Sequence, residues 1–205
     1  LAIIEPASYI PVPEGIAYLR NLTHLAIIKI AEGNLPDGIG NLSNLKKLTV
    51  TGDGSGAPHV RMEYGKLTKL PESIGNLINL THLTLADSVL AELPDSLGKL
   101  RSLTHLTVTG DRHNSYRNKP IMIPESIGNL TNLTKLDLSA NQLNHLPESI
   151  GNLTNLTELD LSANQLTELP TSLDKLTQLE KLQLKDNPLE VLPPELSNLN
   201  DITHF

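Results

Sequence analysis

The chain has 205 residues, no Cys and no Trp, and its 16 basic and 23 acidic side chains give a formal net charge of −7. The absence of Cys excludes disulfide bonds, thiolate zinc sites and a cysteine nucleophile. The net acidity argues against a nucleic-acid partner, whose phosphates are neutralised by Lys and Arg. No apolar stretch approaches the roughly 20 residues that a membrane span needs, so we expect neither nucleic acid nor membrane as a partner.

One repeated unit of 23 residues accounts for most of the chain. Residues 123–143 and 146–166 are nearly identical in sequence. With the apolar residue before each Pro taken as the start, units one to eight begin at Val12, Leu35, Leu70, Leu93, Ile123, Leu146, Leu169 and Leu192. The steps between these starts are 23, 35, 23, 30, 23, 23 and 23 residues, so units two and four are longer by 12 and 7 residues. The two insertions lie near residues 54–66 and 112–120.

Each unit predicts one short strand and one short helical segment. Leucines alternate in the strand, as in Leu136-x-Leu138, so one face is apolar and the other polar. We expect strands near residues 25–27, 48–50, 83–85, 106–108, 136–138, 159–161 and 182–184. A Pro opens the helical segment, as at residues 124–130, where Gly128 would relax the backbone. Because no single unit can bury its own leucines, we expect the units to stack, with parallel strands and one continuous aliphatic core.

An Asn follows the strand in three of the later units, at Asn141, Asn164 and Asn187. Its amide can donate and accept hydrogen bonds at once, so a ladder of these side chains could satisfy buried backbone groups of the turns. The same position holds other residues in the earlier units: Ile30, Asp53, Ser88 and Asp111. We therefore expect the ladder only from unit five onwards.

This unit resembles the leucine-rich repeat family, whose pattern is L-x-x-L-x-L-x-x-N, over almost the whole chain. The L-P-x-x-I-G-N-L form is similar to intracellular scaffold-type repeats, the repeats of Roco-type GTPases, and bacterial repeat proteins that include host-directed effectors. The resemblance implies an α/β fold, a right-handed solenoid with a parallel concave sheet and short helical or 3-10 legs on the convex side. It also implies protein binding far more often than catalysis.

We expect one leucine-rich repeat domain over residues 1–205, with both ends falling within a repeat. Residues 1–4 repeat the strand pattern of residues 25–28, and Phe205 aligns with the first strand leucine. Such a domain would be part of a longer protein. We favour an intracellular location and keep open a secreted bacterial effector.

Two pairs of strand residues raise the question of chemistry. His82 and His105 would be neighbours on adjacent strands and could share a metal ion, but zinc sites take three or four protein ligands and no third lies beside them. Asp137 and Asp160 would have the spacing of a retaining glycosidase, but an open sheet offers no cleft that raises one pKa. We expect no cofactor, no metal and no enzymatic activity within the chain.

The insertions bring residue types that are enriched at binding hot spots, namely Tyr and Arg. Both insertions leave the solenoid after the same strand ending, and residues 1–122 carry a net charge of +1 against −8 for residues 123–205. We therefore predict a monomeric protein-interaction module that binds a protein partner, acidic at its contact surface, on the N-terminal half. The expected contact residues are Lys47, Arg61, Tyr64, His82, Thr84, His105, Thr107, Arg112, Tyr116 and Arg117.

Two alternatives stay open. The chain could be the recognition domain of a larger enzyme or bacterial effector, with a ubiquitin ligase, GTPase or kinase outside it. A small-molecule or glycan site on the concave face is less favoured, because such sites usually use aromatic side chains and the strand faces have few.

Overall fold

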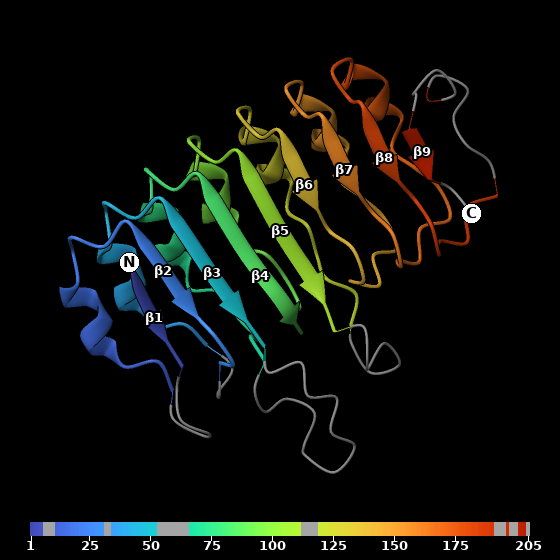
Figure 1. The fold of residues 1–205 in the computed structure, drawn as a ribbon. Coiled ribbons are helices and arrows are strands. Elements are labelled where there is room, and N and C mark those ends of the chain that lie inside the picture. The colour runs from blue at the N-terminus through green and yellow to red at the C-terminus, as the bar shows by residue number, and fades with distance from the viewer. Residues whose placement is uncertain are drawn as a thin grey trace, which may run out of the picture.

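One parallel sheet runs through the length of the molecule, and its strands follow chain order from β1 to β9 (Figure 1). The computed structural model describes residues 1–5, 11–30, 34–52, 66–111, 119–190, 196 and 201–203. The strands are β1 (Ala2–Ile4), β2 (His24–Ile27), β3 (Lys47–Thr51), β4 (His82–Ser88), β5 (His105–Gly110), β6 (Lys135–Asp137), β7 (Glu158–Asp160), β8 (Lys181–Gln183) and β9 (Asp201–Thr203). Every neighbouring pair is parallel, which confirms the expected stacking of units.

The seven expected strands are all present, with small shifts at their ends. β4 and β5 run beyond the expected range, whereas β6, β7 and β8 end one residue early, at Asp137, Asp160 and Gln183. In β6 the Oδ1 atom of Asp137 accepts a hydrogen bond from the backbone N–H of Ser139 at 2.9 Å. In β7 Asp160 makes the same bond with Ser162. These local bonds stabilise the turns that follow the two strands, because an Asp side chain can accept from a backbone N–H two residues further on.

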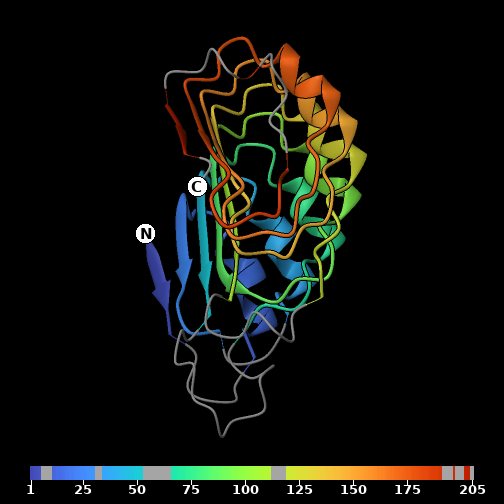
Figure 2. The same ribbon diagram turned by 90° about the vertical axis from the view of Figure 1, so that its right-hand side faces the viewer.

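Short 3-10 helices form the legs on the other side of the sheet (Figure 2). They are η1 (Glu14–Tyr18), η2 (Asp37–Asn41), η3 (Glu72–Asn76), η4 (Asp95–Lys99), η5 (Glu125–Asn129), η6 (Glu148–Asn152) and η7 (Thr171–Lys175). Each follows a Pro with extended backbone angles, such as Pro124 with φ −74° and ψ 154°. Pro suits this position, because its fixed φ is compatible with entry into a helical turn and its missing N–H is not needed there. In the described part of the chain no helix is long and apolar enough to cross a membrane.

The core lies between the sheet and the 3-10 helices and is aliphatic, as the composition predicts. Leucines from every described unit join one cluster, and Ile127, Leu133 and Leu138 are fully buried. Leu136 exposes only 1% of its surface. The alternation of leucines in the sequence therefore identified the buried strand face correctly.

The Gly that recurs at the fourth position of η2 to η6 has a different role from the one expected. Gly128 does not adopt a left-handed backbone; instead, a Cβ atom at this position would lie 2.6 Å from the backbone O of Ser149 in the next leg. Gly75 approaches the backbone O of Ser96 in the same way, at 2.5 Å. The expectation that Gly128 relaxes the backbone was wrong: Gly lets neighbouring legs pack at a distance that any side chain would prevent.

The Asn ladder is present in the later units. The Nδ2 atom of Asn141 donates to the backbone O of Val108 at 2.6 Å and of Leu138 at 2.9 Å. Earlier units differ, as expected: Ile30 is fully buried, and the hydroxyl of Ser88 donates to the backbone O of Thr109. Asp53 lies outside the described residues.

Candidate protein-binding surface

The sheet face opposite the 3-10 helices brings together five of the ten expected contact residues. Lys47 on β3 is the register partner of His82 on β4, and His82 is the register partner of His105 on β5. Thr84 and Thr107 form the same pairing two residues further along β4 and β5. We call these five residues the basic concave surface. The other five expected residues lie outside the described residues: Arg61, Tyr64, Arg112, Tyr116 and Arg117.

The two histidines stack on each other. Their ring centroids are 4.3 Å apart and the ring planes differ by 11°. The Nδ1 atom of His82 lies 2.9 Å from the hydroxyl of Thr81, and this hydroxyl donates its single proton to the backbone O of Lys46. Nδ1 must therefore be the donor in its contact with Thr81, which leaves Nε2 of the neutral ring as an acceptor.

His105 is held in the same way. Its Nδ1 atom lies 2.9 Å from the hydroxyl of Thr104, which donates to the backbone O of Thr81. The repeated Thr-His pair thus fixes the same tautomer in both rings and gives them parallel orientations. The result is two neighbouring Nε2 acceptors on the basic concave surface.

Burial and neighbouring cations favour the neutral form of both rings. Burial lowers the pKa of His82 below its ordinary value of 6.5, and His105, Lys47 and His24 lower it further. Burial also lowers the pKa of His105, with Lys135 adding to the effect and Glu158 opposing it. Near neutral pH, Lys47 therefore supplies the permanent positive charge of this surface, while the histidines supply hydrogen-bond acceptors.

The geometry does not support a metal ion between the histidines. A bridging ion would have to lie in both ring planes, and stacked, nearly parallel rings aim their lone pairs side by side instead of at one point. Within the described ranges, no group of three or more His, Asp or Glu side chains could hold a metal ion.

The acidic pair also has a structural role. Asp137 and Asp160 are register partners on β6 and β7, but each holds a turn through its Oδ1 atom. The second oxygen of Asp160 accepts a hydrogen bond from the Nε2 atom of Gln183 at 3.0 Å. Carboxylates that are used in this way stabilise strand ends, and they offer no general acid for glycoside chemistry.

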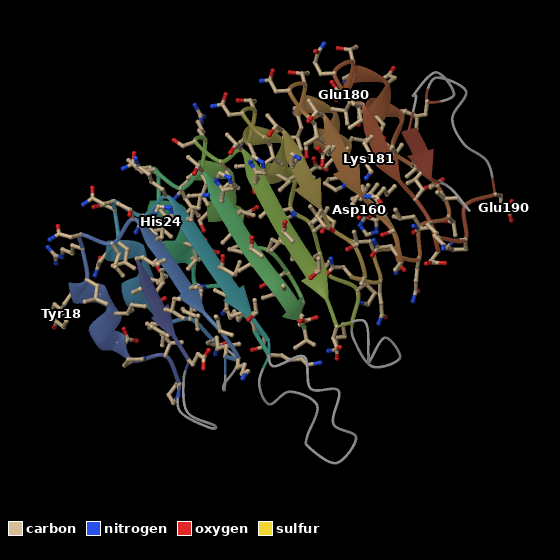
Figure 3. The ribbon with its side chains drawn as sticks, in the orientation of Figure 1. Tyr18, His24, Asp160, Glu180, Lys181 and Glu190 are labelled. Atoms are coloured by element: carbon tan, nitrogen blue, oxygen red, sulfur yellow. The ribbon has the colours of Figure 1, made fainter. Side chains whose placement is uncertain are left out.

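The outward register positions of β6 and β7 carry carboxylates, namely Asp137, Glu158 and Asp160, whereas the same positions of β2 to β5 carry none. His24 lies towards one end of this face, whereas Asp160 and Lys181 lie towards the other (Figure 3). Between them, Lys135 on β6 forms an ion pair with Glu158 on β7. The positive charge of Lys135 is therefore partly compensated, whereas Lys47 has no carboxylate as its register partner.

Sequence reasoning missed one ion pair at the base of the insertions. Lys66 and Asp111 form a salt bridge, and both side chains are buried, with 6% and 2% of their surface exposed. Asp111 occupies the position of the ladder Asn in unit four. A charged residue at an otherwise buried ladder position was the signal in the sequence that a cation must lie beside it.

Two family models match the chain. One described as "Leucine rich repeat" matches residues 131–189, and one described as "Leucine-rich repeat region" matches residues 59–141. No curated protein sequence matches the chain.

Several solved structures are similar to this chain. An internalin (inlF) from Listeria monocytogenes is 21% identical with a TM-score of 0.72, over 96% of this chain and 51% of that one. An internalin C2 (inlC2) from the same organism is 25% identical with a TM-score of 0.67, over 96% of this chain and 76% of that one. The ectodomain of the membrane receptor kinase GASSHO1/SCHENGEN3 from Arabidopsis thaliana is 27% identical with a TM-score of 0.70, over 94% of this chain and 22% of that one.

The chain thus spans about half the length of the first internalin and about a fifth of the receptor ectodomain. These structures and the family models agree with the repeated unit that builds the sheet and its 3-10 legs. The chain belongs to the leucine-rich repeat proteins.

Proposed function

We propose that this chain is a non-enzymatic protein-interaction module that binds an acidic protein surface on its N-terminal half. The observation that carries the proposal is the basic concave surface. Lys47 stands there without a facing carboxylate, beside two histidines whose Nε2 atoms accept hydrogen bonds. Both rings are already held by their Thr partners and by stacking, so they lose little freedom when a partner docks.

The similar structures support binding in general terms. The Arabidopsis receptor ectodomain was solved in complex with CASPARIAN STRIP INTEGRITY FACTOR 2. That statement concerns the receptor, and it supports the proposal that this solenoid also acts by binding another molecule.

The insertions form the second part of the proposal. Arg61, Tyr64, Arg112, Tyr116 and Arg117 belong to insertions that follow β3 and β5, the outer two of the three strands that carry the basic concave surface. Tyr and Arg contribute most of the binding energy at many interfaces. We infer that they border the surface and extend the contact with the partner.

The chemistry of the surface defines what the partner presents. A carboxylate of the partner fits opposite Lys47, and N–H or O–H groups fit opposite the two Nε2 atoms at neutral pH. When the pH falls and the rings take up protons, both Nε2 atoms become donors. An acidic partner is then expected to bind more tightly.

The experiment compares partner capture by matched charge-reversal variants. Lys47→Glu reverses the charge on the N-terminal half, and Lys181→Glu reverses the same column position on β8. Proteins captured from lysate are quantified by mass spectrometry for each variant, and a third variant shortens both insertions to the plain repeat. We expect Lys47→Glu and the shortened variant to lose a partner that Lys181→Glu retains. Equal capture by all three would refute the proposal.

A second candidate is the recognition domain of a larger enzyme. It is favoured by the likeness to the leucine-rich repeat ectodomain of a plant membrane receptor kinase. The sequence of the full-length protein tests this candidate, because a catalytic domain would be evident in it.

A further inference from the structure

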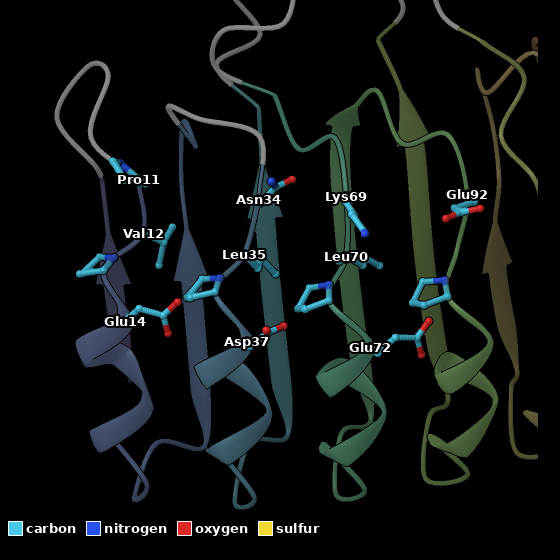
Figure 4. A pocket seen from close by; sticks show the side chains of 14 residues that line it. Pro11, Val12, Glu14, Asn34, Leu35, Asp37, Lys69, Leu70, Glu72 and Glu92 are labelled. Carbon is cyan, nitrogen blue, oxygen red and sulfur yellow. The ribbon is translucent and has the colours of Figure 1, made fainter.

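A groove of about 780 Å³ lies along one edge of the first four units, away from the strand face (Figure 4). Five prolines line it, above the buried side chains of Val12, Leu35 and Leu70. Four of the five are the prolines that precede η1 to η4, and all four have extended backbone angles. The groove therefore has a regular apolar lining that repeats once in each unit.

One rim of the groove carries exposed carboxylates in three successive units, Glu14, Asp37 and Glu72 (Figure 4). Across the described residues, none of the three takes part in a hydrogen bond or an ion pair. The same repeat position behaves differently in the later units. There Glu125 accepts a hydrogen bond from the backbone N–H of Ser149, and Glu148 accepts one from Ser172.

The other rim has mixed polarity. It carries Asn34, Lys69 and Glu92 (Figure 4). The groove as a whole thus has four carboxylates against one ammonium group. This balance favours a cationic ligand and opposes an anionic one.

The spacing of the units fits one kind of peptide. Asn34 and Lys69 form a parallel β-bridge at the rim, so adjacent units are about 4.8 Å apart there and alternate units about 9.6 Å. A polyproline II helix has three residues per turn and rises about 9.3 Å per turn. The spacing of its side chains at every third residue therefore matches the spacing of alternate units, such as those that carry Glu14 and Glu72. Asp37 belongs to the unit between them.

We propose that this groove is a docking site for an extended, proline-rich segment of a protein partner with Arg or Lys at every third residue. The prolines of the ligand pack against the exposed Pro13 and the half-buried Pro36, and its cations pair with the free carboxylates. A polyproline II segment is already extended before binding, so it loses little conformational entropy. The site is separate from the basic concave surface and prefers the opposite charge, so it does not depend on the function proposed above.

The test uses the whole chain and a fluorescent peptide of four Arg-Pro-Pro repeats. Fluorescence anisotropy gives its Kd for the wild-type protein and for the triple variant Glu14→Gln, Asp37→Asn, Glu72→Gln. We expect saturable binding that the triple variant weakens by about tenfold, since each exposed ion pair contributes modestly. Lys69→Gln should tighten binding by about threefold, because it removes the one opposing cation. A damaged fold cannot produce that gain.

Two controls separate the site from general attraction to an acidic protein. The triple variant Glu168→Gln, Asp174→Asn, Glu180→Gln removes the same charge from exposed positions in the C-terminal half and should leave the Kd unchanged. A peptide with the same composition but its four Arg residues clustered at one end should bind less well. Absence of saturable binding, equal weakening by both triple variants, or equal affinity for the clustered peptide would overturn the proposal.

Discussion

Asn164 connects two units through five backbone groups, one of them the O of Ser162. Its Nδ2 atom donates to the backbone O of Leu138 at 3.0 Å and of Leu161 at 2.8 Å. Its Oδ1 atom accepts from the backbone N–H groups of Asn141 and Leu143, both at 3.0 Å. The side chain is buried, so water cannot replace these bonds when the amide is removed.

We therefore expect Asn164→Ala to lower the free energy of unfolding by at least about 3 kcal/mol, because several buried backbone groups lose their partner. Asn155→Ala is the matched control: its Nδ2 atom donates to Thr131 at the exposed surface. It should cost about 1 kcal/mol or less. Urea unfolding of both variants measures the difference, and equal losses would show that the ladder is dispensable.

The buried Lys66–Asp111 salt bridge makes a second prediction for single residues. Removal of one partner leaves the other charge buried and uncompensated, which costs about 3–5 kcal/mol. We expect Lys66→Ala to be destabilising to this extent, and the double variant Lys66→Met, Asp111→Leu to recover much of the loss. Thermal unfolding of the three proteins checks this. A double variant less stable than Lys66→Ala would contradict it.

The 3-10 legs depend on contacts between neighbouring elements. The approach of Gly128 to the backbone of Ser149 leaves no room for a methyl group. Gly15 in η1 is different, since a Cβ atom there would have no neighbour within 4 Å. The two glycines therefore allow the same substitution to be compared in a tight and in an open place.

We expect Gly128→Ala to destabilise the protein by about 1–3 kcal/mol, because the legs must move apart. Gly15→Ala should change the stability by about 0.5 kcal/mol or less. Chemical denaturation provides both values. If Gly128→Ala were as harmless as Gly15→Ala, the legs would not be in the close contact that the structure shows.

The strands could be predicted from the sequence because their leucines alternate in every unit. The early ends of β6, β7 and β8 could not, because the alternation of leucines continues to Leu138, Leu161 and Leu184, one residue past the last residue of each strand. The role of Gly128 was missed for a related reason: the distance between legs is a property of stacked units, and a single unit does not reveal it. Local patterns thus predicted the elements, and contacts between units decided their details.

At the scale of the whole molecule, the histidine column links stability to pH. The pKa values of His82 and His105 are lowered in the folded state from the ordinary value of 6.5. The unfolded chain therefore binds more protons than the folded one as the pH falls below about 6.5. The stability is greatest above this pH and decreases as the pH is lowered towards the pKa values of the folded state.

We expect urea midpoints to fall between about pH 7.5 and about pH 5, and to fall less steeply in the variant His82→Gln, His105→Gln. His145→Gln changes an exposed histidine away from this column and should keep the wild-type slope. Identical slopes for all three proteins would show that the stacked rings titrate as they do in the unfolded chain.

The candidate site could be predicted in part. The repeat period fixed the register of Lys47, His82 and His105, so their meeting on one face followed from the sequence. The tautomer of the histidines did not follow from the sequence. It depends on the hydroxyl of the preceding Thr, which donates its proton to a backbone O of the neighbouring unit. The groove along the prolines was also missed, since Glu14 and Glu125 look equivalent in sequence. They differ in whether a backbone N–H of the next unit donates a hydrogen bond to the carboxylate, as Ser149 does to Glu125.

Site-specific photo-crosslinking tests the central claim that a protein partner docks on the N-terminal part of the sheet face. A photoreactive amino acid replaces Thr84 on β4, Gln183 at the equivalent place on β8, or the exposed Asn129 at the end of η5. After irradiation in lysate, we predict a crosslinked partner at Thr84 that is absent or much weaker at the other two positions. Crosslinking of that partner mainly at Gln183 or Asn129 would place binding elsewhere and contradict the account.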